Sequence, residues 1–179
     1  MKKLVKISSL FILVNLLIAN TAWPTDFFIK AKPPVQRVKM AKGAANPTEL
    51  ARLVVQAIQK NQFADLDAFL PDDEALTLLK SKGSEDMKAL LQNSTAADVK
   101  NRFKTQYEEL IQQGISRTIN WSEMELAETK VGKGSVKNPM VQPLTITLAH
   151  KAKPAVQLML ETAKVNNRYY LFQRIELQP

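Results

Sequence analysis

The chain has 179 residues and a formal net charge of +8, and 45% of its residues are hydrophobic. This apolar content is enough to build a core and argues against a disordered chain. The sequence contains no cysteine, which excludes disulfides, thiolate metal sites and a lipid-modified cysteine.

The first 22 residues have the pattern of a signal peptide. Three lysines precede a largely apolar run from Ile7 to Ala19, and small and polar residues follow it. The run is shorter than the roughly 20 residues that a membrane-spanning helix needs. We expect cleavage after Ala22, with Ala19 as the alternative, and a periplasmic or secreted protein. Export without cysteine is more typical of the bacterial envelope than of animal secreted domains.

Residues 23–45 predict a basic, flexible linker. Pro33 and Pro34 favour an extended chain, and the apolar residues around them follow no clear period. Of the net charge of +8, three charges fall in the leader and four in the linker region, which leaves +1 for residues 47–179. A nucleic-acid-binding domain would concentrate positive charge on its folded surface, so we expect no nucleic-acid partner. The linker is either a solvated spacer or a weak contact with an anionic membrane surface or polymer.

Residues 46–179 predict one folded domain, which opens with a helix. Asn46 can cap this helix, Pro47 fits its first position, and Glu49 completes a capping box. Apolar residues then recur at helical spacing and continue until Pro71 ends the segment. One face of the helix is therefore expected to pack inward.

Two further helices are expected. A short one follows Asp72, with Gly83 closing it at a positive φ. The longest begins at Ser94 or Thr95 and carries one apolar stripe as far as Gly114.

After Gly114 the apolar period changes from near four to two, which predicts strands. Ile119 and Trp121 are out of phase with Met124 and Leu126, so a bulge between the two pairs would keep all four side chains on one face. We expect a sharply bent first strand.

Three more strands follow the first one. In the second strand Leu144, Ile146, Leu148 and His150 alternate with polar or small residues. A hairpin connection at residues 151–154 leads to a third alternating run. Asn166 and Asn167 mark the turn to the last strand, in which these residues share a face: Tyr169, Leu171, Ile175 and Leu177. The whole order predicts an α+β fold with N-terminal helices packed on a four-stranded antiparallel sheet.

This order resembles the nuclear-transport-factor-two-like superfamily, which includes ketosteroid-isomerase and polyketide-cyclase relatives and exported bacterial domains. The resemblance rests on the segments NPTELARLVVQAIQKNQFADLDAFLP, DVKNRFKTQYEELI, NWSEMEL and VQLMLETAKVNNRYYLFQRIEL. It implies a cone in which a curved sheet wraps the longest helix and a pocket opens at one end. Cystatin-like rolls share the packing of a helix on a sheet and are the structural alternative.

The resemblance implies a pocket at the mouth of the cone, and we expect apolar side chains of the sheet and the long helix to line it. The expected ligand-binding residues are Tyr107, Trp121, Leu144, Ile146, Leu148 and His150.

The sequence carries weak signals for catalysis. His150 is the only histidine and would suit proton transfer, but a lone histidine at a strand end is more often packed or solvated. Glu123 and Glu125 lie beside the expected bulge and are the best candidates for a catalytic carboxylate. The enzymatic relatives use a carboxylate base with a tyrosine or second acid, but no motif assigns Tyr107 or Tyr169 to that role.

We therefore expect an exported, noncatalytic binding or interaction module of the bacterial envelope. Its partner would be a small apolar ligand or an envelope protein, and we expect no cofactor and no metal. A sheet face carrying Met159, Tyr170 and Phe172 is the alternative interface. An isomerase, cyclase or dehydratase using the same pocket is the alternative function. The resemblance also implies a homodimer, because relatives often pair through the outer sheet face.

Overall fold

The computed structural model describes residues 42–134, 136, 138–150 and 153–178. The predicted leader and residues 23–41 of the predicted linker lie outside the described residues. Residues 42–45, at the end of that linker, lie against the domain. Ala44 is buried and pairs with Tyr169 through two backbone hydrogen bonds of 2.8 and 2.9 Å. The folded unit therefore includes Gly43 and Ala44, upstream of the first helix.

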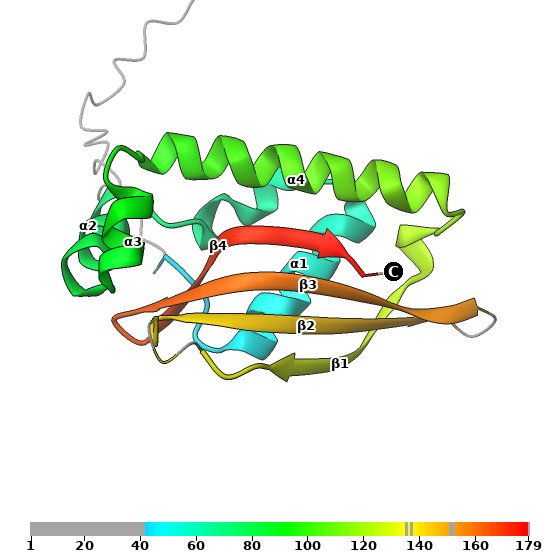
Figure 1. The fold of residues 1–179 in the computed structure, drawn as a ribbon. Helices are drawn as coiled ribbons and strands as arrows, with labels where there is room; N and C mark the ends of the chain where they lie inside the picture. Colours follow the sequence, from blue (N-terminus) through cyan, green and yellow to red (C-terminus); the bar gives the residue numbers. More distant parts are fainter. Residues whose placement is uncertain (1–41, 135, 137, 151–152, 179) are drawn as a thin grey trace, which may run out of the picture. The chain divides into compact units, whose positions relative to one another are not determined.

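Helices come first in the chain and strands follow (Figure 1). The helical elements are α1 (Pro47–Lys60), the 3-10 helix η1 (Phe63–Phe69), α2 (Asp73–Lys82), α3 (Glu85–Leu91), α4 (Ala96–Ser116) and the 3-10 helix η2 (Trp121–Glu123). The strands are β1 (Glu125–Val131), β2 (Val141–His150), β3 (Lys153–Val165) and β4 (Arg168–Leu177). Among the described residues, no helix is long and apolar enough to span a membrane.

The predicted helix starts are confirmed by their caps. The Asn46 side chain accepts a hydrogen bond from the Glu49 backbone N–H at 2.8 Å, and the Glu49 carboxylate accepts from Ala45 at 2.6 Å. Thr95 and Asp98 form a reciprocal capping box at the start of α4. These bonds satisfy backbone donors that the first helical turn leaves unpaired.

The expected positive φ at Gly83 is wrong. Gly83 has a φ of −72° and an extended backbone, because Ser84 caps the next helix immediately. A glycine stands here because a Cβ atom would lie 2.4 Å from the carbonyl oxygen of Leu79. Close packing, and not a left-handed turn, accounts for the residue.

The longest helix does not end at Gly114 but continues to Ser116. A Cβ atom at Gly114 would lie 2.2 Å from three ring atoms of Trp121, so the indole occupies the space of a side chain. The chain turns after the helix at Thr118, whose φ is 56°.

The segment after this turn was expected to begin the first strand, and that expectation is wrong. Ile119 lies outside any strand, and the 3-10 turn η2 brings Trp121 and Met124 into the core together. A 3-10 helix has about three residues per turn, which puts positions three apart on one side. The apolar residues are thus brought into phase without a strand bulge between them. The irregularity within β1 lies later, between Leu126 and Glu128.

The sheet is an antiparallel meander with the order β1-β2-β3-β4, as predicted. Asn166 and Asn167, with φ of 48° and 59°, form the two-residue turn between β3 and β4. The sheet is not strongly curled or closed, which differs from the cone that the resemblance implied. Two helices, α1 and α4, contribute to the core on one side of the sheet.

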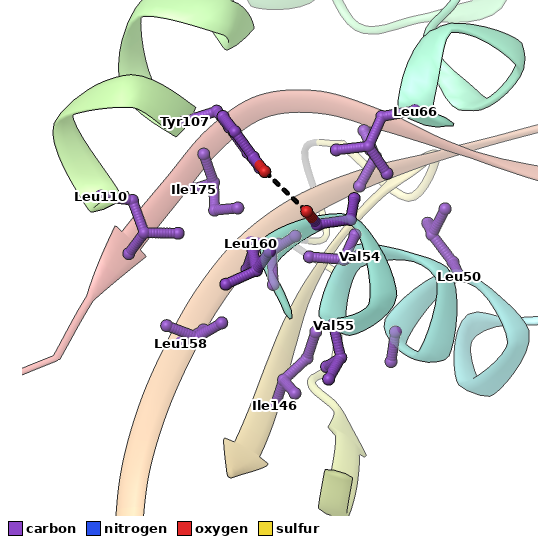
Figure 2. Packing of buried hydrophobic residues seen from close by; sticks show 14 of the residues in the cluster. Leu50, Val54, Val55, Leu66, Tyr107, Leu110, Ile146, Leu158, Leu160 and Ile175 are labelled. Carbon is purple, nitrogen blue, oxygen red and sulfur yellow. Dashed lines mark hydrogen bonds between the residues drawn. The ribbon is translucent and has the colours of Figure 1, made fainter. Parts of the chain in front are cut away.

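The main core lies between the helices and one face of the sheet, here called the inner face. Leu144, Ile146 and Leu148 of β2 point into it with Leu158 and Leu160 of β3. Figure 2 shows three of them, Ile146, Leu158 and Leu160, in the cluster that also contains side chains of α1 and α4. Figure 1 shows α4 running beside β4, and the two elements are in contact.

The opposite face of the sheet, here called the outer face, is covered at one end by α2 and α3. Tyr170 and Phe172 are only 7% and 2% exposed, because they pack with Leu76, Leu79 and Met87. The expected exposed interface of Met159, Tyr170 and Phe172 is therefore wrong for both aromatic residues; Met159 is half-buried.

Candidate functional site

Three of the predicted ligand-binding residues lie in the main core. Leu144, Ile146 and Leu148 are at most 1% exposed and belong to the cluster that joins the sheet to α1. Ile146 lies beside Val55 of α1 (Figure 2). The surface of these side chains is used to pack the helix on the sheet.

Tyr107 lies in the same core and has a backbone partner. Its hydroxyl donates a hydrogen bond to the carbonyl oxygen of Ala57 at 2.8 Å, which joins α4 to α1 (Figure 2). Burial, with the negative charge of Asp65, raises the pKa of Tyr107 to about 12. The ring also makes an edge contact with Phe63 at 5.5 Å. The hydroxyl is protonated at neutral pH and used in helix packing.

Trp121 packs against the end of α4. It is 7% exposed, and its Nε1 donates a long hydrogen bond of 3.4 Å to the carbonyl oxygen of Ile111. Its ring covers Gly114. The indole thus closes one end of the core.

His150, the last residue of β2, lies next to a carboxylate. Its Nε2 is 3.2 Å from Oε2 of Glu123, and its side chain is 24% exposed. The contact is an ion pair when both ring nitrogens of His150 are protonated. It is a neutral hydrogen bond when the imidazole is uncharged and its single proton is on Nε2. The strand end thus places the only histidine of the chain beside an exposed carboxylate.

The structure brings together the three residues that the sequence analysis weighed for catalysis. Glu123, Glu125 and His150 line one hollow of about 450 Å³, together with Ala149 of β2. The register explains this, since Glu125 pairs with Ala149 across the two strands. Within the part of the chain that the structure describes, no group of three or more acidic or histidine side chains is arranged to hold a metal ion. The hollow suits hydrogen-bond donors, cationic groups or proton transfer.

A second, larger hollow lies between α3 and the outer face of the sheet, and is here called the α3 groove. Its volume is about 600 Å³. Its lining residues are Asp86, Met87, Leu90, Lys133, Asn138, Val141, Pro143, Glu161 and Gln173. The Leu90 side chain is 47% exposed. The groove therefore offers apolar surface beside acidic and basic side chains.

Asn138 is one of the polar residues that line this groove. Its Oδ1 is buried and accepts no hydrogen bond from the described residues. Buried acceptors in proteins are nearly always paired, and an unpaired one costs free energy.

Sequence reasoning missed the α3 groove. The sequence patterns assigned no role to the loop of residues 132–140 or to residues 87–91. One signal was available in α3, where Leu90 and Leu91 are adjacent, because a short helix cannot turn two neighbouring side chains to the same core. Leu91 is 1% exposed, and Leu90 is left at the surface.

The chain was compared with protein-family models, with curated proteins and with solved structures, and nothing matched in any of the three comparisons.

Proposed function

We propose that this protein is an exported, noncatalytic binding module of the bacterial envelope, and that the α3 groove is its ligand-binding surface. The single observation that carries the proposal is an open groove of about 600 Å³ with apolar walls from α3 and β2. Ligand pockets are typically apolar hollows of this size with a few polar groups that orient the ligand.

The walls of the groove favour an apolar ligand body. Met87 and Leu90 form one wall from α3, and Val141 and Pro143 form the other from β2. Met87 is 2% exposed and fixed in the second core cluster, so the wall is anchored, while Leu90 offers its side chain to solvent. Burying Leu90 under a ligand would remove apolar surface from water.

The polar residues of the groove define the rest of the ligand. The Asn138 side chain can hydrogen-bond a polar group of the ligand, while Lys133 and Glu161 bring opposite charges to the same hollow. The ligand class that fits is a small apolar molecule with one hydrogen-bonding group. A side chain of an envelope protein could supply the same apolar surface and hydrogen-bonding group, so a protein partner fits the groove as well.

Membership of the nuclear-transport-factor-two-like superfamily is part of this proposal. It is supported by the order of helices followed by a four-stranded meander. Export is supported by the leader pattern of residues 1–22, and contact with anionic surfaces by the basic segment at residues 23–45. In this proposal the ligand lies outside the helix-to-sheet core.

The test uses a fluorescent apolar probe, anilinonaphthalene sulfonate, and two matched variants. Leu90→Asp puts a charge in the groove, and Ile115→Asp puts the same charge at an exposed apolar residue of α4 that does not line the groove (59% exposed). We expect the native protein to enhance the fluorescence of the probe, Leu90→Asp to lose most of the enhancement, and Ile115→Asp to keep it. No enhancement by the native protein, or an equal loss in both variants, would rule out the groove.

A second measurement addresses the natural ligand. Native mass spectrometry of the protein purified from its own envelope reports bound small molecules directly. We expect a retained mass on the native protein that is absent from Leu90→Asp and present on Ile115→Asp.

An enzyme of the isomerase, cyclase or dehydratase type is the second candidate, because His150 and Glu123 form a pair 3.2 Å apart at an open hollow. In such an enzyme the imidazole would move a proton and the carboxylate would orient it. The test is the isomerisation of a β,γ-unsaturated ketone to its conjugated form, followed by ultraviolet absorbance. Catalysis that is lost in both His150→Asn and Glu123→Gln supports this candidate. A rate equal to that of buffer excludes it for this substrate class.

A further inference from the structure

Among the residues that the structure describes, no strand pairs with the free edge of β1. β1 is the outermost strand on its side, and most of its side chains are exposed. The opposite edge, β4, is different, because Ala44 pairs with Tyr169 there and α4 packs beside the strand. An uncovered edge strand presents unpaired backbone groups that can pair with another strand.

The register of β1 identifies which backbone groups face outward. The Gly132 N–H donates to the carbonyl oxygen of Pro143 at 2.8 Å, so this pair is hydrogen-bonded. Hydrogen-bonded and non-hydrogen-bonded pairs alternate along an antiparallel ladder. Lys130 and Glu128 therefore direct their backbone groups to β2, and Thr129 and Val131 direct theirs away from the sheet.

Two side chains of opposite charge flank Thr129, the residue whose backbone groups point away from the sheet edge. Glu128 and Lys130 lie opposite Thr147 and Thr145 of β2, on the outer face of the sheet. Their side chains are 51% and 67% exposed and form an ion pair of 3.1 Å within the strand. Both charges are therefore accessible to a second chain.

We propose that β1 is a self-association edge, at which two copies of this protein pair antiparallel about Thr129 to form one continuous sheet. In this register Thr129 exchanges backbone hydrogen bonds with Thr129 of the second copy. Glu128 of each copy then lies opposite Lys130 of the other, as a non-hydrogen-bonded pair whose side chains are close. Two separate ion pairs become a group of four alternating charges.

The charges select this register over its neighbours. Backbone N–H and C=O groups point away from the sheet only at every second residue of β1. The two copies can therefore pair only in registers in which these residues lie opposite each other. A centre at Glu128 would place two glutamates opposite each other, and a centre at Lys130 would place two lysines opposite each other. A parallel arrangement in register would also align like charges, which destabilises a strand pair.

The dimer is weak, because the paired segment is short. The register irregularity between Leu126 and Glu128 disrupts the strand on one side of the centre, and the strand ends at Val131 on the other. Such a contact falls below the roughly 1,200 Å² of a stable interface, so dimerisation depends on protein concentration.

Sedimentation velocity of the protein over a range of concentrations tests the proposal. We expect a monomer–dimer equilibrium in the native protein. Glu128→Lys and Lys130→Glu should each weaken it by about tenfold or more, because each creates two like-charge pairs. The double variant Glu128→Lys with Lys130→Glu should dimerise as the native protein does. An equimolar mixture of the two single variants should form a heterodimer, since each then faces opposite charges.

Two further variants separate this edge from other surfaces. Thr129→Pro removes an outward N–H that the sheet of the monomer does not use, and should abolish the dimer while the domain stays folded. Glu85→Lys reverses one acid of another exposed ion pair, with Lys88 of α3, and should leave the equilibrium unchanged. A native protein that is monomeric at every concentration would overturn the proposal, as would single variants that form no heterodimer on mixing.

Discussion

Gly114 provides a direct test of how Trp121 packs on the end of α4. Trp121 lies against the backbone of α4, and a Cβ atom at Gly114 would be 2.2 Å from Cε2, Cζ2 and Nε1 of the indole. Gly114→Ala therefore forces the ring to move, since atoms cannot remain at that distance. The expected result is a large loss of stability from the addition of one methyl group.

The magnitude follows from two opposing contributions. Alanine in a helix interior is more favourable than glycine by about 1 kcal/mol. Displacing a buried tryptophan costs up to the roughly 3–5 kcal/mol of its removal from a core. Trp121 is 7% exposed and would also lose its hydrogen bond to Ile111. We expect Gly114→Ala to lower the free energy of unfolding by about 2–4 kcal/mol.

Urea denaturation followed by circular dichroism measures this loss. Gln113→Ala is the matched control, because it adds helix propensity at the exposed neighbour and should change stability by less than about 0.5 kcal/mol. Combining Gly114→Ala with Trp121→Leu should cost less than the sum of the two single changes. A Gly114→Ala protein as stable as the native one would refute the packing of Trp121 on α4.

Three other outcomes are expected from single contacts. Tyr107→Phe removes the donor to the buried carbonyl of Ala57 and should cost about 1–2 kcal/mol in urea denaturation, whereas an unchanged midpoint would contradict the bond. Two hydrogen bonds hold the pKa of Asp72 below its usual value: the larger effect comes from the Lys42 side chain, and the next from the backbone N–H of Ala75 in the first turn of α2. The stability that Asp72 adds is therefore full above the unfolded pKa of about 3.9 and lost as the pH falls through the lower folded value, so the advantage over Asp72→Ala should shrink between about pH 7 and pH 2. Asn167→Val places a branched side chain at a φ of 59° and should lower the free energy of unfolding by about 1–2 kcal/mol, seen as a lower thermal midpoint. An unchanged midpoint would mean that the β3–β4 turn has another shape.

The helices and their starts were predictable because their signals are local. Asn46 and Thr95 cap the helices that follow them, and the bonds that do this span only a few residues. The strand order was also predictable, since alternating apolar residues and short turns leave few arrangements other than a meander. Glu128 and Lys130 were assigned no role, because the outward direction of a strand edge depends on its pairing register.

The segment between α4 and β1 shows the limit of pattern reasoning. Ile119, Trp121 and Met124 are out of phase for a strand, and a bulge was the expected remedy. The chain instead uses a 3-10 turn, which brings Trp121 and Met124 into the core. Both solutions bury the same side chains, so apolar spacing alone does not distinguish them.

The sequence by itself determined which residues start helices, which alternate in strands, and that the strands follow the helices in an α+β domain. Each of these depends on interactions between residues close in the chain. The tertiary structure decided the contacts between distant residues: Trp121 on Gly114, Glu123 beside His150, and α3 over the outer face of the sheet. These depend on strand register and on the packing of whole elements, which no short stretch of sequence specifies.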